Sequence, residues 1–172
     1  MNFSQPLSAR ALLLGALLCA GGAQAHVTLE YQVAHAGTGY KATFKVGHGC
    51  GASATRQVVV DIPVGVGAPH PMPKPGWQLA IDPAASNAGV ARVTWTARTR
   101  EDALPSAHYD EFVLVARMPA QAGTLYWPVR QVCDEGRNDW IEIPSAGQKL
   151  SDLKSPAAVL EVLPASGGGH AH

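Results

Sequence analysis

Apolar and polar residues alternate along most of this chain, and a period of two predicts β-strands rather than helices. The alternation begins at residues 27–31, where Val, Leu and Tyr are separated by Thr and Glu. Five further β-rich runs are Tyr40–Val46, Gln57–Ile62, Arg92–Ala97, Glu111–Met118 and Leu125–Val132. Clusters of turn-forming residues separate the runs, and no segment carries the apolar stripe of a three-turn helix.

The composition agrees with one folded domain. The chain has 172 residues, of which 47% are hydrophobic and 15% are charged. Eight or nine short strands in a domain of this size predict an all-β fold, a two-sheet β-sandwich of immunoglobulin or cupredoxin type. A closed barrel is the alternative. Lys plus Arg and Asp plus Glu number 13 each, so no charge excess favours nucleic acid or an anionic membrane surface.

The first 25 residues have the pattern of a signal peptide. Arg10 supplies a positive charge, residues 11–20 form an apolar run too short to span a bilayer, and Ala23-Gln24-Ala25 fits a signal-peptidase site. We therefore expect an exported protein, periplasmic or alternatively secreted. An uncleaved anchor and a lipoprotein attached through Cys19 are the competing interpretations.

Cleavage after Ala25 would leave a domain at 26–164 and a flexible tail with Gly and His at 165–172, with no transmembrane anchor in the mature chain. Cys50 and Cys133 would be the two cysteines left, and an oxidising compartment favours a disulfide between them. A pair of metal-binding thiolates is the alternative, although the CxxC spacing of soft-metal sites is missing.

Cleavage would also make His26 the first residue. The α-amine and the imidazole of one terminal histidine can chelate a single ion. The pKa of an α-amine is ordinarily about 7.7 to 8.0, so a metal ion displaces its proton readily. Nitrogen donors in an open, planar arrangement favour Cu(II) over other divalent ions of the first row. The sequence therefore predicts a Cu(II) site at His26.

Six motifs are spread over nearly the whole mature chain. They are His26-Val27-Thr28-Leu29-Glu30, Val46-Gly47-His48-Gly49-Cys50, Lys74-Pro75-Gly76-Trp77, Val93-Thr94-Trp95, Tyr126-Trp127-Pro128-Val129, and Cys133 with Gly136 and Trp140. Together they resemble the YcnI-like copper-binding domain family. The resemblance implies an exported β-sandwich, distantly similar to CopC-type copper carriers, that holds Cu(II) in a mono-histidine brace. It makes His26 the brace residue, places Trp140 beside the metal, and implies another copper-handling protein as partner.

The further copper ligand departs from the family pattern. Where some members supply a carboxylate, this chain has His48, which would add a third nitrogen donor. A hydrogen bond within the Gly-rich loop is the alternative role for His48, and a place in the core is the alternative for Trp140. Glu30 is ranked below His48 as a ligand, because roughly 13 Å of strand separates it from His26, although both share one face.

Other polar clusters are weaker candidates. The sequence His108-Tyr109-Asp110-Glu111 alternates between two faces, which indicates a solvated strand edge. Asp134 and Glu135 carry no sign of a substrate cleft, and no nucleophile, zinc-protease, phosphate-loop or dinucleotide motif occurs. The remaining histidines, in loop-like or Gly-rich sequence, are His35, His70, His170 and His172.

Three classes of function follow from these features. We favour a non-enzymatic Cu(II) carrier, chaperone or buffer that serves another protein. A brace-type copper monooxygenase is the second class, and it would need redox cycling and a substrate face with exposed aromatic rings. A metal-free adhesion or assembly sandwich, acting through its strand edges, is the third class.

Overall fold

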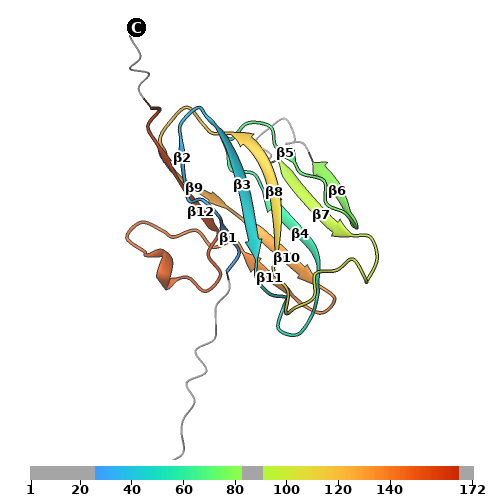
Figure 1. Cartoon of the computed structure of the whole chain (residues 1–172). Coiled ribbons are helices and arrows are strands. Elements are labelled where there is room, and N and C mark those ends of the chain that lie inside the picture. Colours follow the sequence, from blue (N-terminus) through green and yellow to red (C-terminus); the bar gives the residue numbers. More distant parts are fainter. Residues whose placement is uncertain (1–25, 83–90, 167–172) are drawn as a thin grey trace, which may run out of the picture.

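Two β-sheets pack face to face in the computed structural model, which describes residues 26–82 and 91–166 (Figure 1). The first sheet has the order β1 (Thr28–Leu29), β3 (Gly39–Val46), β8 (Asp110–Arg117) and β5 (His70–Pro71). The second has the order β11 (Arg137–Trp140), β10 (Val129–Cys133), β4 (Thr55–Asp61), β7 (Arg92–Ala97) and β6 (Trp77–Asp82). The predicted all-β sandwich is therefore confirmed.

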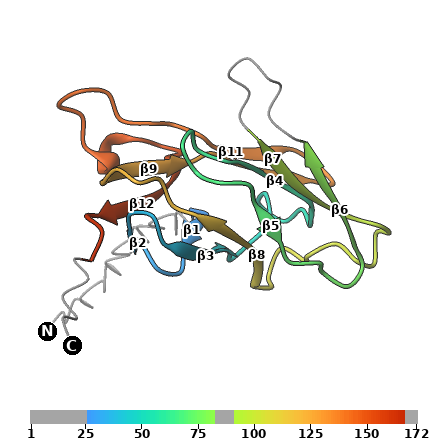
Figure 2. The same cartoon turned by 90° about the horizontal axis from the view of Figure 1, so that it is seen from above.

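A third, smaller sheet closes one end of the two layers, as Figure 2 shows from above. Its order is β2 (Val33–His35), β12 (Ala158–Leu163) and β9 (Gly123–Trp127). One short 3-10 helix, η1 (Leu150–Asp152), precedes β12. Across the part of the chain that the structure describes, no helix has the length and apolar character needed to cross a bilayer.

One predicted strand is wrong in its extent. The run Leu125–Val132 is not a single strand but the end of β9 and most of β10, which belong to different sheets. The break falls at Pro128, because proline has no backbone N–H to donate to a ladder. Strands β2, β5, β6, β11 and β12 were not among the predicted runs. His35 and His70, expected in loops, lie in β2 and β5, and both are exposed as expected.

The alternation buries one face of each sheet in a shared aromatic core. Trp95, Trp127, Phe44 and Phe112 are fully buried. Phe112 meets Trp95 and Trp77 edge to face, with ring centroids 5.7 and 5.0 Å apart. Phe44 meets Trp127 in the same way at 5.7 Å. Three of the four tryptophans are thus committed to the centre of the sandwich.

The disulfide between Cys50 and Cys133 is confirmed. It joins the loop after β3 in the first sheet to the last residue of β10 in the second sheet. The two residues are 83 positions apart in the chain and 6.0 Å apart between their Cα atoms. The bond therefore fastens the two layers together at one end of the sandwich.

The second sheet carries an ion-pair clamp on Asp61. The guanidinium groups of Arg92 and Arg130 each lie 2.6 Å from one oxygen of the Asp61 carboxylate. Partial burial alone would raise the pKa of Asp61, but the hydrogen bonds and positive charges of Arg92 and Arg130 outweigh it and hold that pKa below its usual range. The clamp therefore favours the folded state whenever Asp61 is ionised.

We expect Asp61→Asn to lower the free energy of unfolding at pH 7 by about 1.5 to 3 kcal/mol, the usual contribution of hydrogen bonds to a charged group. The pKa of Asp61 is lower in the folded state, so its contribution is present above about pH 4 and is lost as the pH falls through the folded pKa. Chemical denaturation from pH 7 to pH 3 tests this. The difference between Asp61→Asn and the unmodified protein should shrink with acid, whereas the exposed neighbour Asp82→Asn should show little difference at any pH.

Candidate functional site

His26 and Trp140 lie against each other where the edges of the two sheets meet. The centroids of their rings are 5.2 Å apart and the ring planes meet at 62°. Trp140 is the last residue of β11 and only 7% exposed, whereas His26 precedes β1 and is half-buried. The structure thus brings together the two residues that the family resemblance implies as brace histidine and neighbouring tryptophan, although 114 positions separate them in the chain.

Strand pairing explains why His26 reaches this place. Thr28 pairs with Lys45 and Leu29 with Phe44 in β3, so the chain before Thr28 runs antiparallel toward the C-terminal end of β3. On the other side, Trp140 pairs with Val129 of β10. The site therefore lies between an edge of the first sheet and an edge of the second, next to the loop that follows β3.

His48 belongs to that loop. Its ring Nδ1 lies 2.6 Å from the carbonyl oxygen of Gly49. Because a carbonyl only accepts, this bond requires the proton on Nδ1, and in the tautomer with that proton Nε2 has a lone pair for another partner. Metal-binding histidines commonly donate one ring N–H to a backbone carbonyl in this manner. Both roles weighed for His48, loop hydrogen bond and ligand, are therefore compatible with one ring orientation.

Glu30 has a different partner. Its carboxylate lies 3.1 Å from the ammonium group of Lys45, and both side chains are partly exposed. Any use of Glu30 as a ligand would have to compete with this ion pair. Among residues 26–82 and 91–166, no three His, Cys, Asp or Glu side chains gather closely enough to hold one ion.

The sequence analysis missed Gln131. This residue of β10 is 1% exposed and lies at an inward position between Val129 and Cys133. Its amide nitrogen donates to the carbonyl oxygen of His48 at 2.6 Å, and its amide oxygen lies 3.4 Å from the indole nitrogen of Trp140. The signal was available in the sequence, since a glutamine at a core position of an alternating strand must find buried partners.

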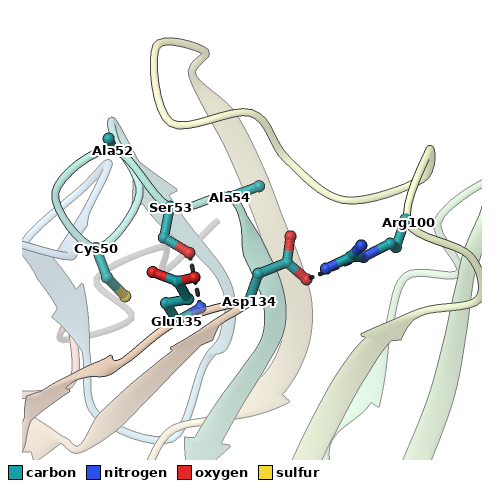
Figure 3. A pocket seen from close by; sticks show the side chains of 7 residues that line it. All are labelled: Cys50, Ala52, Ser53, Ala54, Arg100, Asp134 and Glu135. Atoms are coloured by element: carbon teal, nitrogen blue, oxygen red, sulfur yellow. Dashed lines mark hydrogen bonds and ion pairs between the residues drawn. The ribbon is translucent and has the colours of Figure 1, made fainter.

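A depression of about 540 Å³ lies beside the disulfide. Figure 3 shows its lining, with the Asp134 carboxylate directed at Arg100 and the backbone of Glu135 hydrogen-bonded to Ser53. Asp134 and Glu135, which carry no sign of a substrate cleft in the sequence, line this depression. The Asp134 carboxylate is paired there with Arg56 at 3.4 Å and Arg100 at 4.0 Å. This pairing favours a structural role over acid–base chemistry.

Within the described residues, the other sequence candidates are not gathered at this site. Tyr109 donates to Glu111 at 2.6 Å, and Asp110 binds Lys74 at 2.6 Å, so the two faces of this segment separate as predicted. The segment continues into β8, which lies between β3 and β5 and is not a sheet edge. His170 and His172, like the expected signal peptide at 1–25, lie outside the described residues.

Comparison with known proteins agrees with this fold. A crystal structure of an uncharacterized protein from Nocardia farcinica, described as having an immunoglobulin-like fold, superposes with a TM-score of 0.67 at 26% sequence identity. The alignment covers 82% of this chain and 99% of the other. None of the curated proteins matches the chain. Residues 26–162 match a family described as a domain of unknown function (DUF1775), and this chain belongs to that family.

Proposed function

We propose that this protein is exported, binds Cu(II) through the amine and imidazole of His26, and serves as a copper carrier, chaperone or buffer for another protein. The observation that carries the proposal is the contact between His26 and the buried Trp140. It sets a residue that would become N-terminal at a defined place on the rigid sandwich, under an indole ring.

Three further features support the proposal. The family match begins at His26, the residue that the expected cleavage would expose. In the tautomer with its proton on Nδ1, the His48 ring offers Nε2 as a further nitrogen donor in the adjacent loop. The resemblance to YcnI-like copper-binding proteins implies the same pair, brace histidine and tryptophan.

We assign a separate role to each of three residues at the proposed copper site. His26 would hold Cu(II) through its amine and ring, and the bound ion would supply Lewis-acid and redox chemistry. Trp140 would shield one side of the ion from water, because its indole is buried against the sandwich. His48 would either complete the nitrogen set or orient the loop, and both roles use the Nδ1 bond to Gly49.

The direct test is a Cu(II) titration of the exported protein, after mass spectrometry has established that it begins at His26. We expect one-to-one binding, quenching of Trp140 fluorescence and nitrogen hyperfine structure in the electron paramagnetic resonance spectrum. His26→Ala should abolish all three signals, whereas the exposed His35→Ala should leave them unchanged. A similar titration for His26→Ala and the unmodified protein would overturn the proposal.

Two other outcomes identify the competing functions. Copper-dependent peroxide production from ascorbate and oxygen would point to a redox enzyme. Binding that disappears with His170→Ala and His172→Ala, but not with His26→Ala, would assign copper to the tail. A protein that binds no copper in any form would be a metal-free assembly module.

A further inference from the structure

All four hydrogen-bonding positions of the Gln131 side chain are occupied, although this residue is almost fully buried. Its Nε2 donates to the carbonyl oxygen of His48 at 2.6 Å and to the hydroxyl of Thr55 at 2.8 Å. Its Oε1 accepts from Asn138 Nδ2 at 3.3 Å and from Trp140 Nε1 at 3.4 Å. A side-chain amide has two donor hydrogens and two acceptor lone pairs, so none is left over.

The partners fix the orientation of this amide. The carbonyl of His48 can only accept a hydrogen bond, and the indole N–H of Trp140 can only donate one. A flipped amide would set oxygen against oxygen at His48 and N–H against N–H at Trp140. Gln131 therefore has one orientation in which both groups are satisfied, and that orientation links the His48 loop to the indole ring.

The side-chain amide of Gln131 and the disulfide join the same two segments, the loop after β3 and strand β10. Gln131 and Cys133 are two positions apart and point inward from β10, and their partners His48 and Cys50 are also two positions apart. The loop after β3 is thus attached to β10 by the disulfide, by the backbone N–H of Cys50 on Cys133 Sγ at 3.1 Å, and by the Gln131 amide. The covalent bond sets the position of the loop, whereas the amide bond also reaches Trp140.

We propose that Gln131 is the positioning residue of the copper site, which holds the indole of Trp140 against His26 and the His48 loop beside it as one unit. The inference deepens the proposed function and rests on it for its copper readouts. Gln131 touches no metal in this scheme. It acts through Trp140 and through the backbone of His48.

Gln131→Met tests the proposal because it keeps a similar length and volume and removes all four hydrogen bonds. In the metal-free protein, the indole N–H resonance of Trp140 should move and its exchange with water should accelerate. With Cu(II), affinity should fall by about 10-fold to 100-fold, the usual effect of losing a group that orients a ligand. The nitrogen hyperfine pattern should change as well. An unchanged Trp140 resonance together with unchanged affinity would overturn the proposal.

Gln131→Glu separates the bond to Trp140 from the bonds to His48 and Thr55. It keeps the acceptor for Trp140 but removes both donors, so the Trp140 resonance should stay near its original position while the resonances of the His48 loop move. Thr55→Val is the matched control, because it removes one bond of Gln131 on the side away from His26 and Trp140. It should lower stability and leave the copper spectrum unchanged. A copper spectrum altered as strongly by Thr55→Val as by Gln131→Met would reduce Gln131 to a general structural role.

One measurement needs no variant. The Trp140 indole N–H of the unmodified, metal-free protein should exchange slowly with water, as should that of Trp95, which donates to the Met72 carbonyl at 3.1 Å. Rapid exchange at Trp140 would contradict the Gln131 linkage even if every variant failed to fold. If the unmodified protein binds no Cu(II), the proposed function fails, and the metal-free indole measurements still decide whether Gln131 positions Trp140.

Discussion

Adding the four residues Gly-Ser-Gly-Ser before His26 is expected to lower Cu(II) affinity by more than about 100-fold, beyond the usual loss for a group that only supports a ligand. The extension turns the α-amine of His26 into an amide, which removes one of two donors that belong to the same residue. After an extension of only one or two residues, the new α-amine, the intervening backbone amides and the His26 ring could all bind the same Cu(II) ion. An extension of four residues avoids this. The melting temperature should not change, because β1 begins at Thr28 and the core begins at Val27.

Restoring the terminus provides the control for this experiment. A protease that removes the extension and leaves His26 first should recover the original affinity and the original paramagnetic spectrum. His35→Ala in the extended protein should add nothing to the loss. Equal affinity with and without the extension would exclude the amine as a ligand, and it would leave the contact between His26 and Trp140 as ordinary packing.

The sequence was sufficient to predict the fold because alternation is a local property. Each run of β-branched and aromatic residues shows its buried face directly, and β7 begins and ends at the predicted residues. Strand β11 was missed because Arg137, Asn138 and Asp139 have little preference for a strand. It forms because β10 offers it a partner at four successive positions. Such pairing depends on the whole sheet and leaves no local pattern.

Some features of the candidate site could be predicted from the sequence and others could not. His26 and Trp140 could be named from the sequence, because the expected cleavage and the resemblance to a family single them out, and the structure brings their rings together. The partners of Gln131 could not be predicted, because they depend on the segment 48–55 meeting the hairpin 131–140, which lies far away in the chain. The ion pair of Glu30 with Lys45 likewise depends on the register of β1 against β3.

Replacing both Cys50 and Cys133 by serine is expected to lower the free energy of unfolding by about 2 to 5 kcal/mol. The bond spans 83 positions, so its loss releases a long loop in the unfolded chain and raises the entropy of that state. For a domain of this size the melting temperature should fall by roughly 10 °C. Thermal unfolding of the variant and of the unmodified protein, each with and without reductant, measures the effect. Reductant should destabilise only the protein that has the bond.

The same variant separates stability from copper binding. Without the disulfide, the loop after β3 is still attached to β10 by the bond from Gln131 to His48, and the contact of His26 with Trp140 does not involve either cysteine. Cu(II) affinity should therefore fall by about 10-fold or less, near the lower end of the usual effect of supporting groups. Combining the cysteine replacements with Gln131→Met should reduce the favourable free energy of Cu(II) binding by more than the sum of the two separate effects. In either variant alone the remaining link still holds the loop after β3, whereas the combined variant has neither the disulfide nor the Gln131 amide. Simple additivity would mean that the two links hold the loop independently.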